Sequence, residues 1–147
     1  MTDIELISYL GPKIVIAIIC GAIVGIERER KHKSAGIKTI TLICLGAMIF
    51  TCINYLVDQN RDGRIISQIV TGIGFLGAGA IIRPTRATVA GMTTAAMIWI
   101  MASIGVLIGL GFIIVPVCLS LLIAIATTAI SHIEKRLFPI SDKQDPN

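Results

Sequence analysis

The longest uncharged stretch of the chain constrains its fold more than any other feature. From Ala87 to Ser131 there is no Asp, Glu, Lys or Arg in 45 residues. As one helix this stretch would measure about 67 Å at ~1.5 Å per residue, which is about twice the ~30 Å hydrocarbon core of a bilayer. It must therefore turn back once, and Gly109-Leu110-Gly111 offers the turn. This pattern predicts a membrane protein.

Composition and charge placement agree with a membrane protein. The chain is 54% hydrophobic and only 15% charged, against roughly 25% charged residues in an average soluble domain. The net charge of +4 comes from basic residues at the ends of apolar runs, where they contact lipid headgroups. We therefore expect the lipid bilayer as a partner and no nucleic acid. Asp3 and Glu5 stand where a cleavable signal would be basic, so we expect the first span to be retained.

The uncharged runs predict an all-α integral membrane protein with about five transmembrane helices. Pro12 is expected near the start of the first helix, where its missing N–H is harmless, and residues 2–10 either cross the bilayer or lie along it. The charged stretch Glu27–Lys38 is expected to be a loop. Residues 1–131 form the predicted transmembrane domain and 132–147 a short cytoplasmic tail, with spans at about 6–26, 39–57, 65–82, 87–108 and 112–130.

The distribution of Lys and Arg predicts the orientation in the membrane. With five spans and the N-terminus outside, ten basic residues lie in the cytoplasm and three outside. If the third segment were a re-entrant loop, five would lie inside and eight outside, so we favour five spans with a cytoplasmic C-terminus. The cytoplasmic residues are then Arg28, Arg30, Lys31, Lys33, Lys38, Arg83, Arg86, Lys135, Arg136 and Lys143.

Glycines are concentrated in the third segment, at Gly72, Gly74, Gly77 and Gly79. The first three match the G-x-G-x-x-G pattern of dinucleotide sites, but that motif needs a preceding strand and a later acidic residue, and this one lies in an apolar run. We interpret these glycines as a helix-packing motif, with a loosened helix as the alternative. Gly21/Gly25 and Gly105/Gly109 have the GxxxG spacing of helix contacts within or between protomers.

Polar residues inside the spans are few. Glu27 lies where the first span meets the aqueous phase and either pairs with neighbouring cations or faces the bundle interior. Gln68 and Asn54 need interhelical partners, and structural hydrogen bonding is their simplest role. Cys20, Cys44, Cys52 and Cys118 lack metal-ligand spacing. No nucleophile–base pair or paired carboxylates occur, so we expect neither enzymatic activity nor a cofactor.

Four motifs in order resemble the MgtC/SapB family of membrane proteins. They are Gly25–Glu29, Ala35–Thr39, Arg64–Gly79 followed by the basic Arg83, and Val89–Ala96 followed by Ile98 and Trp99. The resemblance covers residues 14–130. It implies a bacterial inner-membrane protein linked to magnesium limitation, acid stress and survival of pathogens inside host cells. One mechanism that it implies is restraint of the F-type ATP synthase, which would be a membrane protein partner.

The chain departs from the family pattern at two places. Many members carry a cytoplasmic ACT-like C-terminal domain, and the residues after Ile130 are too few for one, so we expect it to be absent. Some relatives have Asn at the position of Thr93. Two other classes of function stay open: a magnesium or proton transporter or channel, and a structural membrane subunit. We expect a homodimer.

We predict a functional polar cluster made of Glu27, Arg28, Gln68, Arg83, Thr93 and Thr94. Charge sidedness places Glu27, Arg28 and Arg83 at the cytoplasmic face. A straight third helix would put Gln68 roughly 20 Å from them, so one compact site requires a break at the glycines. The sequence does not decide whether the site binds a metal.

Overall fold

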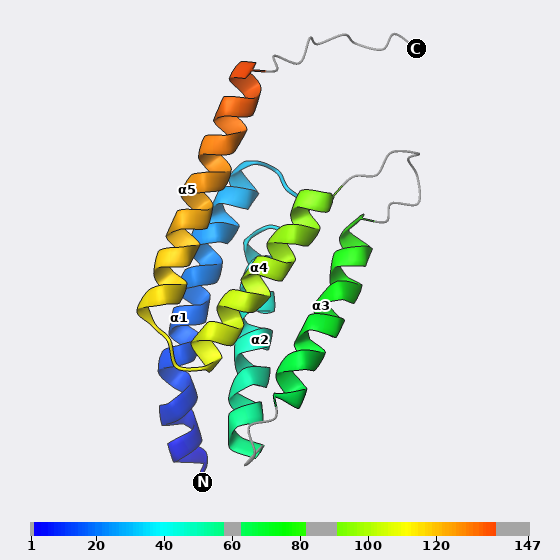
Figure 1. Ribbon diagram of the computed structural model, residues 1–147. Helices are drawn as coiled ribbons and strands as arrows, with labels where there is room; N and C mark the ends of the chain where they lie inside the picture. Colours follow the sequence, from blue (N-terminus) through cyan, green and yellow to red (C-terminus); the bar gives the residue numbers. More distant parts are fainter. Residues whose placement is uncertain (1, 58–62, 82–90, 138–147) are drawn as a thin grey trace.

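The computed structural model describes residues 2–57, 63–81 and 91–137, and all its helices are long and apolar enough to cross a membrane. The helices are α1 (Asp3–Arg30), α2 (Ile37–Val57), α3 (Arg64–Ile81), α4 (Met92–Gly109) and α5 (Ile114–Leu137) (Figure 1). The described residues contain no strand. The prediction of an all-α membrane protein with five spans is therefore confirmed.

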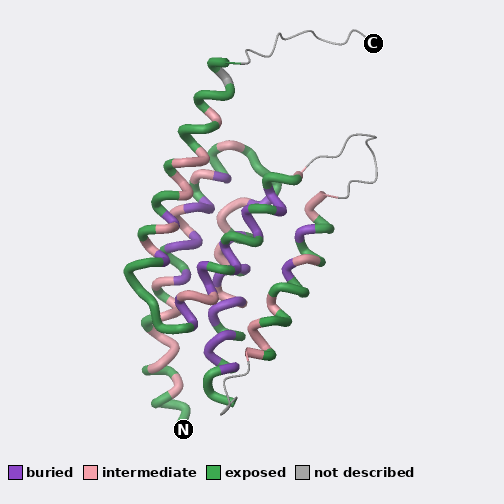
Figure 2. Tube along the Cα trace, viewed as in Figure 1, coloured by how far each residue is buried: buried purple, intermediate pink, exposed green. Residues whose placement is uncertain are grey.

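Helices α1, α2 and α4 form the centre of the bundle. Helix α2 packs extensively against both α1 and α4, while α5 packs mainly on α1 and α3 mainly on α4. Buried positions are accordingly concentrated in α1, α2 and α4, whereas α3 and α5 at the two edges are largely exposed (Figure 2). Apolar residues exposed on the edge helices are suited to contact lipid, which is as apolar as they are.

The two GxxxG pairs pack inside the protomer. A Cβ atom on Gly21 or Gly25 would meet the backbone of Thr41 or Ile37 in α2. A Cβ on Gly105 would meet the Cys44 carbonyl, and Gly109 lies equally close to α2. These glycines let three helix backbones approach closely, which is how small residues stabilise contacts between membrane helices.

The glycines of α3 lie in a different environment. A Cβ on Gly72, Gly74 or Gly79 would have no neighbouring atom within 4 Å, while one on Gly77 would lie 3.6 Å from the indole nitrogen of Trp99 in α4. Only Gly77 therefore lies at a helix contact within the described protomer. The helix is continuous from Arg64 to Ile81, so the glycines do not break it.

Two predicted boundaries are wrong. Helix α1 begins after Thr2, whose hydroxyl and amide form a capping box with Glu5, so Pro12 lies inside the helix instead of near its start. A transmembrane helix tolerates proline because neighbouring groups satisfy the freed backbone. The charged stretch Glu27–Lys38 is also partly helical, since α1 continues to Arg30 and α2 begins at Ile37. The connecting loop is therefore 31–36.

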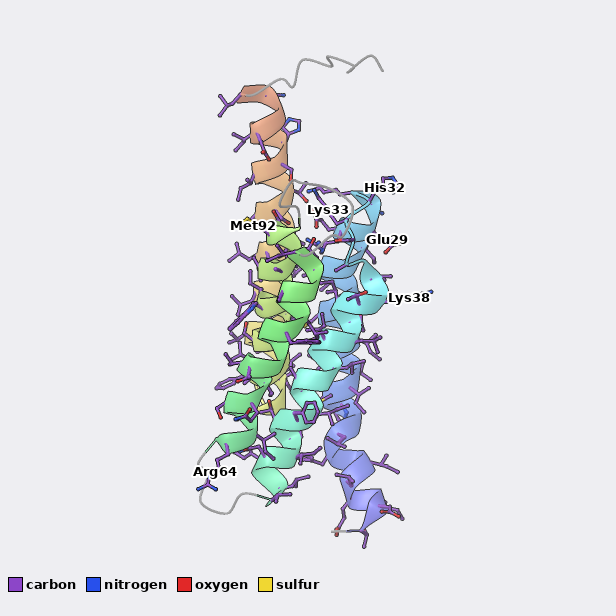
Figure 3. The ribbon with its side chains drawn as sticks, turned by 90° about the vertical axis from the view of Figure 1, so that its right-hand side faces the viewer. Glu29, His32, Lys33, Lys38, Arg64 and Met92 are labelled. Carbon is purple, nitrogen blue, oxygen red and sulfur yellow. The ribbon has the colours of Figure 1, made fainter. Side chains whose placement is uncertain are left out.

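The bundle has one strongly basic end. There α1 ends and α2 and α4 begin, and we call it the basic end for its residues Arg28, Arg30, Lys31, Lys33 and Lys38. Figure 3 shows Glu29, His32, Lys33, Lys38 and Met92 at this end and Arg64 at the opposite one. That the basic end faces the cytoplasm stays a prediction.

Candidate functional site

A buried arginine connects three parts of the bundle at the basic end. Arg28 is only 2% exposed. Its Nε donates a hydrogen bond to the Ala35 carbonyl oxygen at 2.8 Å, and an Nη atom donates to Oγ1 of Thr94 at 2.8 Å. The Ser34 hydroxyl oxygen lies 3.3 Å from the same Thr94 oxygen. We call Arg28, Ser34, Ala35 and Thr94 the Arg28 cluster.

The position of Arg28 follows from the helix face that it occupies. Gly21, Gly25 and Arg28 are spaced i, i+4 and i+7, so they share one face of α1. Because the two glycines bring α2 against this face, the arginine side chain is enclosed between α1, the 31–36 loop and α4. The planar guanidinium with its several donors is suited to bind two acceptors at once.

Glu27 faces another part of the bundle. Its carboxylate forms an ion pair with Lys31, and the Lys31 Nζ also lies 3.3 Å from the Thr127 carbonyl oxygen and 3.3 Å from the Ser131 hydroxyl. Both acceptors belong to α5. The Glu27–Lys31 pair therefore fastens α1 to α5 and lies apart from the Arg28 cluster.

The remaining predicted site residues are dispersed. Thr94 is buried in the Arg28 cluster, while its neighbour Thr93 is exposed. Gln68 lies near the start of α3, toward the other end of the bundle, and Arg83 lies outside the described residues. Of the predicted polar cluster, the structure thus brings Arg28 and Thr94 together. Ser34 and the Ala35 carbonyl were not predicted. Only the Ala35–Thr39 motif, which begins at Ala35 directly after Ser34, could have indicated them.

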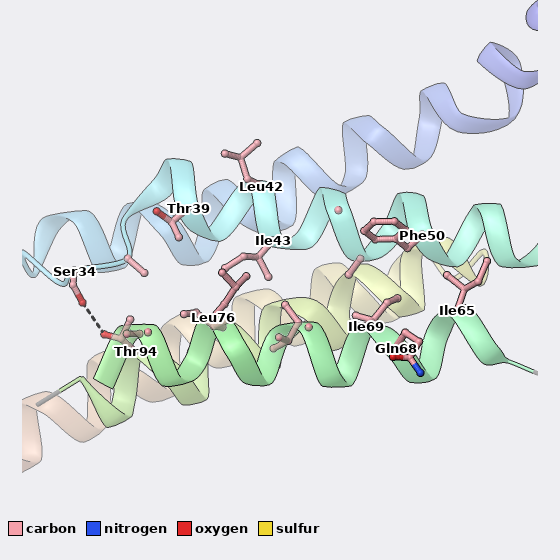
Figure 4. A pocket seen from close by; sticks show the side chains of 18 residues that line it. Ser34, Thr39, Leu42, Ile43, Phe50, Ile65, Gln68, Ile69, Leu76 and Thr94 are labelled. Carbon is pink, nitrogen blue, oxygen red and sulfur yellow. Dashed lines mark hydrogen bonds between the residues drawn. The ribbon is translucent and has the colours of Figure 1, made fainter. Parts of the chain in front are cut away.

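A groove of about 900 Å³ runs along helices α2, α3 and α4. Ser34 and Thr94 meet at one end of it, and Phe50, Ile65 and Gln68 lie at the other (Figure 4). Between the ends its wall is mostly apolar, and Gly46, Gly72 and Gly79 leave it open. We call it the α2–α3–α4 groove. Its lining residues are Ser34, Ala35, Thr39, Leu42, Ile43, Gly46, Ala47, Phe50, Ile65, Gln68, Ile69, Gly72, Ile73, Leu76, Gly79, Ala80, Thr94 and Ile98.

A second cation, which is partly buried, lies toward the opposite end of α1. The Lys13 ammonium donates to the carbonyl oxygen of Gly109 at 3.0 Å and lies 3.8 Å from the centroid of the Tyr9 ring. Gly109 is the last residue of α4, and a cation there complements the negative end of the helix dipole. Lys13 therefore joins α1 to the end of α4. Within the described part of the chain, no three His, Cys, Asp or Glu residues gather as a metal site would require.

Asn54 anchors the otherwise loosely packed α3. It is 2% exposed, and its Oδ1 accepts a hydrogen bond from the Ile65 amide at 3.1 Å. This bond satisfies a free N–H in the first turn of α3, and it gives Asn54 the interhelical partner that its sequence context required.

We expect Asn54→Ala to destabilise the bundle by about 1 kcal/mol, because the partly buried Ile65 amide loses its acceptor. The measurement is SDS-induced unfolding in mixed micelles, followed by circular dichroism. Ser67→Ala is the matched control, since the exposed Ser67 hydroxyl bonds to the Arg64 carbonyl of its own helix. Equal losses for the two variants would contradict an anchoring role for Asn54.

Comparison with known proteins gives consistent matches. A sequence model described as the MgtC family matches residues 14–136. Protein MgtC of Salmonella typhimurium is 44% identical over 98 residues, which are 67% of this chain and 42% of that protein. Protein MgtC of Brucella abortus is 43% identical over 98 residues, 66% of this chain and 41% of that protein.

An uncharacterized protein of Haemophilus influenzae is 32% identical over 124 residues, covering 78% of this chain and 52% of its own length. The chain thus spans about half or less of the length of these curated relatives. No solved structure matches it.

Proposed function

Since the chain belongs to the MgtC family and is a multi-pass membrane protein, we propose that it regulates ion and proton homeostasis by binding another protein in the bacterial inner membrane. The proposed partner is the F-type ATP synthase, which the chain restrains under magnesium limitation or acid stress. The family resemblance suggests the partner and the conditions. The placement of charged side chains in the bundle favours regulation by contact with that partner.

The placement of the interior charges carries this proposal. Among the described residues, Lys13 and Arg28 extend from α1 to other parts of the bundle, and both are cationic and bonded to backbone carbonyls. They lie about 22 Å apart along α1. A cation crossing this bundle would meet positive charge near both ends, and Glu27 is already neutralised by Lys31. This charge arrangement favours a regulator over the alternative of a magnesium or proton pathway within one protomer.

The outer face of α3 is the surface that we assign to the partner. Val70, Thr71, Gly74, Phe75 and Ala78 share one face at i, i+4 spacing, and Phe75 is 82% exposed. This face is distinct from the positions of α3 that line the groove. A glycine beside an exposed aromatic residue gives a partner helix both a close approach and a large contact area.

The test is ATP-driven proton pumping in inverted membrane vesicles, with wild type, Phe75→Ala and empty vector at matched protein levels. ATP hydrolysis and passive proton leak are measured in the same vesicles. We expect wild type to lower pumping and hydrolysis together without added leak. Loss of an aromatic hot spot weakens binding by more than about tenfold, so Phe75→Ala should relieve most of the inhibition.

The matched control is Leu122→Ala on α5, because Leu122 is also an exposed apolar residue, at 61%, on the opposite edge of the bundle. It should inhibit as wild type does. Pumping that falls only because the vesicles leak would favour the transport alternative. Vesicles in which pumping, hydrolysis and leak are all unchanged by the wild-type protein would favour a structural membrane subunit.

A further inference from the structure

Arg28 is a buried cation that forms no ion pair with a described residue. No carboxylate in the described part of the chain forms an ion pair with it, because Glu27 pairs with Lys31 and Glu29 accepts from the Ile37 amide. One Nη atom of Arg28 makes no hydrogen bond to a described residue. A buried charge is costly unless it is paired. Both acceptors of Arg28, Ala35 and Thr94, line the α2–α3–α4 groove, so the guanidinium charge lies directly behind the groove wall.

The hydroxyl groups of the Arg28 cluster form a chain of hydrogen bonds that leads from the guanidinium to the groove. Arg28 donates to the Thr94 oxygen, which leaves the Thr94 hydroxyl hydrogen free to donate to Ser34. The Ser34 hydroxyl can then donate outward, and such a chain of hydrogen bonds polarises its last donor. Ser34 is exposed at the end of the groove, beside the exposed Thr39.

The first turn of α4 adds to the positive potential at the same place. Helix α4 starts at Met92, and no side chain of the described residues caps its first N–H groups, which need other acceptors. At the start of α2 the Ile37 amide already donates to the Glu29 carboxylate, and the exposed Lys38 and Thr39 follow it. The N-terminus of α4 carries partial positive charge, which favours an anion.

The rest of the groove is suited to a hydrocarbon chain. From Ala80 to Ile65 it follows α3 for about 22 Å, which exceeds the ~15 Å depth of one leaflet. Its apolar walls come from residues such as Ile43, Ile69 and Leu76, and its volume of about 900 Å³ lies within the range of small-molecule sites. The groove therefore has a cationic, hydroxyl-rich head and a long apolar body.

We propose that the α2–α3–α4 groove binds an anionic phospholipid from the leaflet at the basic end. Its phosphate accepts hydrogen bonds from Ser34, Thr39 and the first amides of α4, and it balances the charges of Arg28 and Lys38. An acyl chain extends along the groove toward Phe50. A partner helix would fill the apolar body without supplying an anion at the head. This inference does not rest on the proposed regulation of a partner, which uses the other face of α3.

The test is native mass spectrometry of the purified full chain with dioleoyl phosphatidylglycerol and dioleoyl phosphatidylethanolamine, which share acyl chains and differ in charge. We expect the anionic lipid to bind about tenfold more tightly, as a charge-assisted hydrogen bond allows. Ser34→Ala should remove most of this preference. Gly72→Leu should weaken binding of the anionic lipid about tenfold, because the new side chain occupies the groove.

Gly74→Leu is the matched control, since Gly74 also has open space around it but does not line the groove. It should bind the anionic lipid within about twofold of wild type. Circular dichroism checks that each variant is folded. Equal binding of the two lipids by wild type, or equal losses in Gly72→Leu and Gly74→Leu, would overturn the proposal. So would a dimer that retains no lipid and dissociates in Gly72→Leu, because a second copy would then occupy the groove.

Discussion

Gly105→Ala is expected to destabilise the bundle by about 3 kcal/mol, whereas Gly74→Ala should leave its stability unchanged or raise it by up to about 1 kcal/mol. Alanine adds only a Cβ atom to either position. At Gly105 this atom would overlap the Cys44 carbonyl oxygen and lie 2.9 Å from the Cβ of Ala47. At Gly74 it would have no neighbour within 4 Å.

The difference between the two expected effects has a physical reason. At Gly105 the obstacle is the backbone of α2, which cannot rotate away, so α4 must move outward and lose contacts along the most extensive helix interface of the protein. At Gly74 the substitution only exchanges a poor helix former for the best one. Comparing the stabilities of the two variants therefore distinguishes the cost of disturbing tight packing from the gain in helix propensity.

The fluorescence of Trp99 provides a measure of unfolding for the Gly105→Ala experiment. It is the only tryptophan of the chain, and its indole lies against Gly77 on α3. Its fluorescence during SDS titration reports the loss of tertiary contacts, while circular dichroism reports the helices. Equal unfolding midpoints for Gly105→Ala and Gly74→Ala would show that α2 and α4 do not approach as closely as described.

The glycines also show where sequence analysis reaches its limit. Gly21/Gly25, Gly105/Gly109 and the series Gly72–Gly79 all suggest helix packing by their spacing. The first two pairs lie between helix backbones, whereas most of the series faces open space. Spacing places residues on a common face of a helix, but the neighbour of that face depends on the arrangement of the whole bundle.

The spans themselves could be predicted because burying charge in lipid is costly, so uncharged runs of sufficient length mark them. Helix ends were harder to predict. The capping box of Thr2 and Glu5 starts α1 well before Pro12, and the charged residues from Glu27 to Arg30 continue the helix because glutamate and arginine are good helix formers. A change from apolar to charged residues marks the end of a span and not the end of its helix.

The candidate site was only partly predictable for a similar reason. Arg28 and Thr94 are 66 residues apart in sequence, and they meet because α1 and α4 both pack on α2. Only the motif resemblance pointed to the two residues together. Glu27 adjoins Arg28 in sequence but lies about 100° further around the helix, so it faces α5 and pairs with Lys31.

Arg28→Lys combined with Thr94→Val is expected to reveal a coupling free energy of about 1.5–3 kcal/mol, the range for hydrogen bonds to charged groups. Lysine keeps the positive charge but has one nitrogen, so it cannot reach Ala35 and Thr94 with the paired geometry of the guanidinium. Valine keeps the shape of Thr94 and removes its hydroxyl. SDS unfolding of the four proteins of the cycle measures the coupling.

Each result of this cycle has a distinct meaning for the buried arginine. A coupling near the upper value, with Arg28→Lys itself destabilising, means that the Arg28–Thr94 hydrogen bond holds α4 to α1. A coupling near zero would contradict that role. Because Arg28→Lys retains the charge, a loss of stability in this variant is assigned to geometry, and the effect of the charge is tested separately by the preference for anionic lipid.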